Sequence, residues 1–294
     1  MATKTVNWKM KQRQGTASQW ASKNPVLAAG EFGYDTTNDV VKIGDGKTAW
    51  LSLPSFRKKK YDLDSLSWAE IAEIAKAGRA ACVFNIGDEK TITLSTGGKI
   101  TLVILGFFHD TYYDSEYDED TSYTITFGMK NCLATRYQMN ASNTNVGGWE
   151  SSKMRTSVMP TLLSQLPADL QSVIKSVYKK TSAGNKSTTI TTTNDKLFLL
   201  SEVEVNGTTA TTYADEGEQY AYFKRNGGYV QYGNDGYYPN GIKALSNGDG
   251  DSYGWWLRSP VVARASAFRF VGSVGYVISG GASLSCGVSF GFCV

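Results

Sequence analysis

The sequence predicts an α+β protein built from two domains. Apolar and polar residues alternate along the first strands, residues 151–163 and 168–177 have the pattern of two helices beside a β-rich remainder, and a charged stretch at 56–64 interrupts both patterns. We therefore expect a small β domain at residues 1–56, a linker with a helix at 57–80, and a larger mixed domain at 81–294.

Composition narrows the possible partners. The chain of 294 residues is 41% hydrophobic and 12% aromatic, which suits packed cores and Tyr-rich recognition surfaces. Its net charge of +3 is too small to predict nucleic-acid binding. It has no run of 18 apolar residues and no apolar leader, so we expect synthesis in the bacterial cytoplasm and no membrane insertion. The four Cys lack CxxC spacing and are expected to be free thiols.

Short β elements dominate the first 56 residues. Residues 5–14 alternate as in a strand, Thr16 is placed to cap a short helix, and residues 31–35 and 40–43 flank a hairpin loop. A segment with so few apolar residues has a marginal core, and trimerisation would supply the missing burial. The Lys run at 58–60 is expected to be a solvated part of the linker.

The middle of the chain alternates strands with a few helices. Ser67 and Glu70 form a capping-box pattern that begins an amphipathic helix ending at Gly78. Strands are predicted at 83–86, 90–94, 99–108, 124–129 and 196–200. The Gly- and Tyr-rich stretch 206–253 predicts mainly loops.

No catalytic motif stands out. His109 is the single His, which excludes a two-His metal site, and the sequence contains no G-x-S-x-G or phosphate-binding loop. The acidic loop 114–120 suits either a hard cation such as calcium or a solvated turn. We predict no enzyme activity, no cofactor and no resident metal, although two carboxylates that meet in space could still hydrolyse a glycan.

The last forty residues have an unusual composition. Gly254 to Pro260 contains two adjacent Trp and an Arg and has the pattern of a buried strand. Residues 261–294 then contain no Lys, Glu, Gln, Met or Trp, although these five types occur 53 times before them. A buried strand pair would exclude Lys, Glu and Gln, but it would not exclude Met and Trp. The missing types share one property, which is that no codon of the form NNC encodes them.

This pattern resembles the variable proteins of diversity-generating retroelements, in which template adenines are randomised and AAC codons become NNC codons. Those proteins end in a C-type-lectin-like (formylglycine-generating-enzyme-like) domain with the pattern G-x-W-W-L-R-S-P, a variable run, and G-V-x-x-x-F-C-V. Here Gly254 to Pro260, the variable region 261–294, Gly287-Val288 and Phe292 to Val294 carry the pattern. The resemblance extends from Val83 to the end and implies a lectin-like domain that binds a ligand.

A second resemblance lies in the N-terminal segment. A pattern common in phage tail fibres is matched by Arg13, Gly15, Thr16, Trp20, Asn24 to Glu31, Lys42 to Gly46, Trp50 and Pro54. The segment is similar to the N-terminal domain of phage major tropism determinants. That similarity implies a β-prism-like domain in a homotrimer, which contacts other phage tail proteins in the virion tail.

The family pattern sorts the variable region into scaffold and exposed positions. The expected scaffold of the site consists of Trp255, Trp256, Arg258, Val271 and Val277. The expected ligand-binding residues are Arg264, Arg269, Phe270, Ser273, Val274, Tyr276, Ile278, Ser279, Ser283, Leu284 and Cys286. Aromatic and Arg side chains are the usual anchors of such a surface.

The predicted function is that of a receptor-binding, tropism-determining tail protein of a phage or prophage. Its partner would be a host cell-surface protein or glycan. A glycan-degrading tail enzyme and a purely structural fibre protein are the alternatives.

Overall fold

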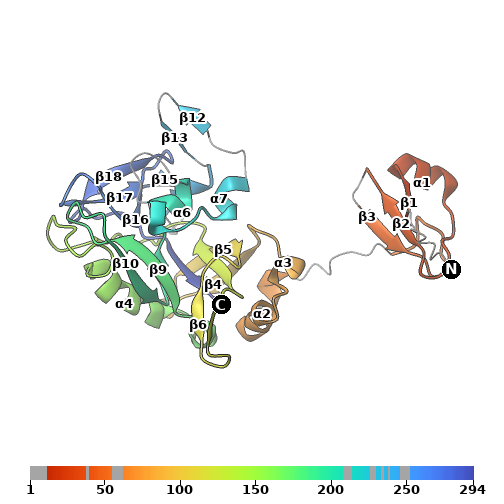
Figure 1. The fold of residues 1–294 in the computed structure, drawn as a ribbon, viewed down its shortest axis with the longest axis horizontal. Coiled ribbons are helices and arrows are strands. Elements are labelled where there is room, and N and C mark those ends of the chain that lie inside the picture. The colour runs from red at the N-terminus through yellow and green to blue at the C-terminus, as the bar shows by residue number, and fades with distance from the viewer. Residues whose placement is uncertain are drawn as a thin grey trace, which may run out of the picture. The chain divides into compact units, whose positions relative to one another are not determined.

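The computed structural model describes residues 12–37, 40–54, 62–207, 214–225, 230–232, 235–237, 239–245 and 252–294. The chain divides into two compact units, Met1–Lys60 and Tyr61–Val294 (Figure 1). Most of the strand predicted at 5–14 and the Lys run at 58–60 lie outside the described residues. Within the described part of the chain, no helix is both long and apolar enough to cross a membrane.

The first unit is a small three-stranded sheet with one helix. β1 (Arg13–Gly15) pairs in parallel with β2 (Phe32–Asp35), which pairs antiparallel with β3 (Val40–Ile43). Thr16 and Gln19 form a capping box that begins α1 (Ala17–Lys23). The described core holds Leu27, Leu53 and the rings of Trp20 and Trp50, which stack with centroids 3.9 Å apart. A core of four side chains agrees with the marginal core expected from the sequence.

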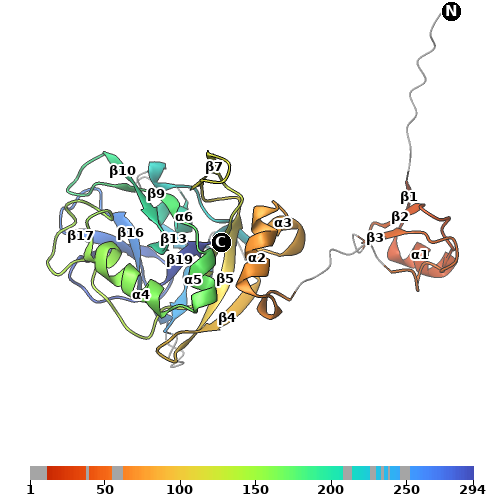
Figure 2. The same ribbon diagram turned by 90° about the horizontal axis from the view of Figure 1, so that it is seen from below.

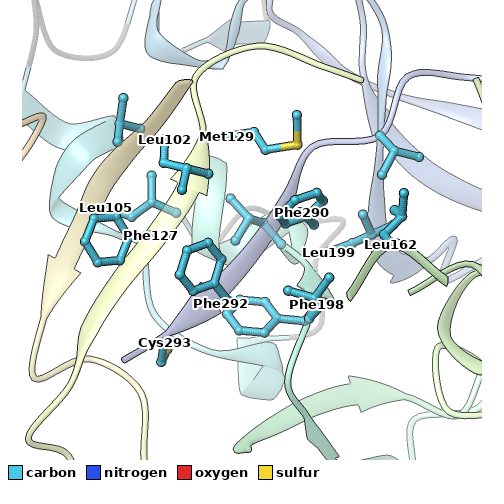
Figure 3. Packing of buried hydrophobic residues seen from close by; sticks show 14 of the residues in the cluster. Leu102, Leu105, Phe127, Met129, Leu162, Phe198, Leu199, Phe290, Phe292 and Cys293 are labelled. Atoms are coloured by element: carbon cyan, nitrogen blue, oxygen red, sulfur yellow. The ribbon is translucent and has the colours of Figure 1, made fainter. Parts of the chain in front are cut away.

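A five-stranded antiparallel sheet forms the centre of the second unit. Its order is β11 (Phe198–Leu199), β19 (Phe290–Cys293), β8 (Ile125–Met129), β5 (Lys99–Phe107) and β4 (Glu89–Thr93). Phe127 and Phe292 stack with their ring centroids 5.5 Å apart in the core beside Phe198 (Figure 3). The last residues of the sequence therefore lie inside this sheet and not at its edge.

The helix predicted in the linker belongs to the core of the second unit. Ser67 caps α2 (Trp68–Lys76) as expected, with Glu70 completing the capping box. The ring of Trp68 meets Phe127 and Phe292 edge-on, with centroids 5.3 and 5.9 Å away. Within the predicted segment 57–80, residues 68–76 therefore pack as part of the second unit, because the apolar face of an amphipathic helix needs a partner to cover it.

A second, three-stranded sheet carries the C-terminal variable region. It consists of β16 (Trp255–Pro260), β17 (Ala267–Val271) and β18 (Val277–Gly281), all antiparallel. The hairpin of β9 (Val177–Ser182) and β10 (Ile190–Asp195) lies near β16 and α6 (Glu202–Asn206), as Figure 1 and Figure 2 show. The other elements are η1 (Leu63–Ser65), α3 (Ala80–Val83), β6 (Tyr112–Asp114), β7 (Glu119–Thr121), η2 (Met154–Val158), α4 (Met159–Gln165), α5 (Ala168–Val173), η3 (Ala214–Glu216), α7 (Ala221–Arg225), β12 (Val230–Tyr232), β13 (Asp235–Tyr237), η4 (Pro239–Gly241), β14 (Lys243–Ala244) and β15 (Ser252–Tyr253).

Three local predictions differ from the structure. The strand expected at 83–86 is replaced by the end of α3 and a turn. The second helix expected at 168–177 ends at Val173, because Val177 already pairs in β9. The stretch 206–253, expected to be loops, contains short helices and strands where it is described.

Candidate ligand-binding surface

β16 provides a buried support for the variable region. All six of its residues are buried, and the side chains of Trp255 and Trp256 have no exposed area. Trp255 Nε1 donates a hydrogen bond to the carbonyl of Gly241 at 2.8 Å, and Trp256 Nε1 donates to that of Tyr137 at 2.9 Å. Both indole N–H groups are therefore satisfied, as buried Trp side chains require.

Arg258 fastens β16 to its neighbours through a buried ion pair. Its guanidinium donates to both carboxylate oxygens of Glu204 at 2.5 and 2.8 Å and to the carbonyl of Leu199 at 2.9 Å. Lys179 donates to Glu204 at 3.0 Å from the other side. Burial opposes ionisation, but Arg258 and Lys179 outweigh it and lower the pKa of Glu204. A bidentate buried pair of this kind fixes the orientation of the strand.

The outward side chains of the variable region follow β17, β18 and the turns beside them. β18 pairs with β17 so that Phe270 faces Ile278 across the ladder. Ile278 is 45% exposed, Leu284 47% and Val274 59%. We define the variable-region surface as the predicted site residues that are exposed or half-buried, apart from Arg269 and Phe270, namely Arg264, Ser273, Val274, Tyr276, Ile278, Ser279, Ser283 and Leu284.

Three predicted site residues lie elsewhere. Cys286 is only 8% exposed, and burial raises the pKa of its thiol to about 11. The side chain of Arg269 is 12% exposed and its Nε lies 3.0 Å from a carboxylate oxygen of Glu202. Phe270 is half-buried and meets the ring of Trp256 edge-on at 5.6 Å. Cys286 and Arg269 therefore lie mostly inside the fold and Phe270 packs against β16, and the ligand-binding role predicted for these three residues stays untested.

The expected scaffold residues lie beneath this surface. Val271, the last residue of β17, is fully buried. It pairs with Val277, the first residue of β18, which is half-buried. Together with β16 they contribute inward-facing side chains to the three-stranded sheet. The ligand-binding role of the outer residues stays a prediction.

Polar side chains outside the variable region hold its loops, and sequence reasoning did not identify them. Asn145 Nδ2 donates to the carbonyls of Arg264 and Ala267, both at 2.7 Å. Asn143 Oδ1 accepts from the hydroxyl of Ser283 at 2.9 Å. These Asn residues lie more than a hundred positions away in the sequence, and their type alone is equally typical of a turn.

The buried ion pair of Arg258 and Glu204 also lines a cavity of about 640 Å³. Its lining includes Lys179, Glu204 and Arg258 together with the segment 107–111. The ring of His109 stacks on that of Tyr220 at 3.9 Å, and burial lowers the pKa of His109. The sequence did not predict this cavity.

The carboxylates that line the cavity are held by internal partners. Asp110 accepts from Thr126 at 2.6 Å and from Tyr220 at 2.8 Å, in addition to its ion pair with Lys179. Glu216 accepts from the amide of Ser182 at 2.9 Å and from the hydroxyl of Ser259. Among the described residues, no group of three or more His, Cys, Asp or Glu side chains is arranged to hold a metal ion.

The acidic loop 114–120 has partners of its own. Asp118 accepts a hydrogen bond from Tyr113, Asp120 accepts from Tyr178 at 2.9 Å, and Glu116 pairs with Lys76 at 2.5 Å. Nothing here decides between the two alternatives for this loop, a hard cation and a solvated turn.

Two protein families match the chain. The family described as Major tropism determinant N-terminal domain matches residues 11–48. The family described as Domain of unknown function (DUF6273) matches residues 124–294, a range that contains Lys179, Glu204, Arg258 and the whole variable-region surface. Neither the curated proteins nor the solved structures provide a match. The chain belongs to the DUF6273 family, and its N-terminal segment links it to the tropism determinants of phages.

Proposed function

We propose that this chain is a receptor-binding protein of a phage or prophage tail, and that the variable-region surface binds a ligand on the host cell. The single observation that carries the proposal is the contrast within one sheet. A fully buried strand, β16, supports outward side chains whose composition follows a restricted codon set. A surface of this kind changes its side chains without changing its backbone.

The two ends of the family pattern meet in space, which supports a C-type-lectin-like domain as part of the proposal. Trp256 N donates to the carbonyl of Gly287 at 3.0 Å, so the Gly254 to Pro260 end of the pattern contacts its Gly287-Val288 end. The residues between these two ends therefore leave β16 and return to it. We propose that a diversity-generating retroelement produced its sequence.

Binding energy at such a surface would come from a few large side chains. Tyr276, Ile278, Leu284 and Arg264 are the candidates, because hot spots are enriched in aromatic and Arg residues with apolar neighbours. A rigid support limits the ordering entropy lost on binding. The N-terminal unit would attach the protein to the tail, and a homotrimer would add avidity to a weak single site.

We propose binding without catalysis at this surface. Its polar side-chain groups are Ser hydroxyls, the phenol of Tyr276 and the guanidinium of Arg264, and none of its members is a carboxylate or an imidazole that could serve as the partner in an acid–base pair. The proposed localisation is the virion tail.

The decisive experiment measures adsorption of the labelled full chain to a panel of bacterial strains. On a strain that the parent labels, replacing Tyr276, Ile278 and Leu284 together by Ala should reduce binding at least about tenfold with the melting temperature unchanged. The matched control is Tyr117→Ala, an aromatic side chain that is 61% exposed on the separate β6–β7 hairpin, where binding should persist. Retained binding by the triple variant, or a parent chain that labels no strain, contradicts the proposal.

A further inference from the structure

A second candidate site is the cavity of about 640 Å³. Three sequence-distant elements contribute its floor, with Lys179 from β9, Glu204 from α6 and Arg258 from β16. Its size falls within the range of small-molecule sites. It shares no residue with the variable-region surface, so it is independent of the function proposed above.

The floor of the cavity carries balanced charge. Lys179 lies between the carboxylates of Asp110 and Glu204, and Arg258 completes the group with its bidentate pair to Glu204. Each of these four side chains is at most 5% exposed, and their polar atoms bond one another. They offer no excess charge to an ionic ligand. Glu216 also lines the cavity, but burial raises the pKa of its carboxyl to about 7, so it adds no charge when it is protonated. At the rim the exposed Lys180 is balanced by the exposed Glu218.

Aromatic rings occupy the mouth of the cavity. Phe108 is 37% exposed, and its backbone has a φ of 55°, a left-handed conformation that is rare for a bulky residue. Its N–H donates to the carbonyl of Thr124 at 3.0 Å, and its ring meets Tyr123 edge-on at 6.1 Å. Such strained residues are retained where the surrounding structure holds them, and they cluster at ligand sites. Beside it, His109 is held flat against Tyr220.

We propose that this cavity binds a neutral saccharide. The ring of Phe108 would pack against the apolar face of a sugar, as aromatic side chains do with C–H surfaces. The imidazole of His109, whose pKa is lowered by burial, stays neutral at pH 7 and offers one donor and one acceptor to hydroxyl groups. Lys180 and Glu218 at the rim supply further hydroxyl partners. Because the floor is electrically balanced, neither an anion nor a cation is favoured over an uncharged ligand.

The single His of the chain makes the test specific. The imidazole proton signals of the full-length chain are followed by NMR during titration with glucose, galactose, mannose, N-acetylglucosamine and their trisaccharides. Sulfate and putrescine serve as anionic and cationic probes. We expect at least one neutral sugar to shift the His109 signals in a saturable manner, and the two charged probes to leave them unchanged.

Two variants separate recognition from folding. Phe108→Gly removes the ring but fits the left-handed backbone, so the melting temperature should not fall, while sugar affinity should drop at least about tenfold. Ile278→Ala, on the variable-region surface, should leave sugar binding unchanged. Saturable shifts with sulfate or putrescine alone, no shift with any neutral sugar, or full affinity in Phe108→Gly would overturn the proposal. None of these outcomes bears on host adsorption through the variable-region surface.

Discussion

β16 and β18 belong to the same three-stranded sheet but differ in how deeply their side chains are buried. Every residue of β16 is buried, whereas β18, on the outer side of β17, has no fully buried residue. Exchange of a buried side chain creates a cavity or leaves a buried polar group without a partner. Exchange of an exposed side chain changes the stability little. The comparison teaches that the stability of this sheet is concentrated in one strand, which leaves the side chains of another free to vary.

Replacement of Arg258, in the buried strand β16, is expected to cause the largest loss of stability. Arg258→Ala leaves the carboxylate of Glu204 buried with Lys179 as its remaining cation, and we expect a loss of about 3–5 kcal/mol in the free energy of unfolding. Urea denaturation of the full chain, followed at the transition of the second unit, measures it. The control is Arg264→Ala, an exposed Arg in the same region, which should cost less than about 0.5 kcal/mol. Similar losses for the two variants would contradict the contrast.

pH sharpens the contrast through Glu216, which bonds the hydroxyl of Ser259 in β16. Burial raises the pKa of Glu216 from 4.5 to about 7, so the folded state binds a proton that the unfolded state has released between these values. This group therefore contributes stability at pH 5 that is lost as the pH rises to 8. Glu216→Gln mimics the protonated form, and its free energy of unfolding relative to the parent should rise by about 2 kcal/mol from pH 5 to pH 8. Denaturation curves at both pH values test this; a difference independent of pH would argue against a protonated Glu216.

Arg269 lies at the boundary between the two kinds of residue. Its ion pair with Glu202 is partly buried, and burial raises the pKa of Glu202 to about 7 although Arg269 opposes that shift. Without Arg269 the pKa of Glu202 rises further, so ionisation at high pH becomes more costly. We expect Arg269→Ala to lose about 1–2 kcal/mol at pH 8 and clearly less at pH 5.5, where Glu202 is protonated in both proteins. Equal losses at the two pH values would show that the residue acts through packing alone.

The smallest effect on stability is expected at the variable-region surface. Ile278→Ala and Leu284→Ala, at side chains that are 45% and 47% exposed, should each change the free energy of unfolding by about 0.5 kcal/mol or less. Thermal denaturation of both variants measures this. A loss as large as that of a core residue would mean that the outer strand carries stability after all.

The core strands of the C-terminal region were predictable because their residues have one use. Adjacent Trp255 and Trp256 next to Leu257 have few placements other than a core, and all three are fully buried. The capping box at Ser67 and Glu70 was equally readable, since its two hydrogen bonds are local. The boundary of the linker was not, because only the packed structure shows which surface covers the helix.

The charged part of the structure escaped sequence reasoning for a physical reason. Arg258 and Lys179 meet Glu204 across separations of 54 and 25 residues, and no local pattern links them. The codon composition likewise marks which positions vary but not which way a side chain points. Arg269 and Cys286 carry that composition and still face inward, because strand register decides their direction.

β19 has a consequence for how this chain can evolve. Phe290 to Cys293 pair with β11 on one side and β8 on the other, and Val294 exchanges backbone hydrogen bonds with Ile125 at 3.0 and 3.2 Å. A frameshift anywhere in codons 261–289 would replace this strand and remove its pairing with both β11 and β8. Base substitutions preserve the reading frame and the strand with it. Only a chain that is translated in frame as far as β19 can therefore complete the five-stranded sheet, so the fold itself selects against frameshifted products.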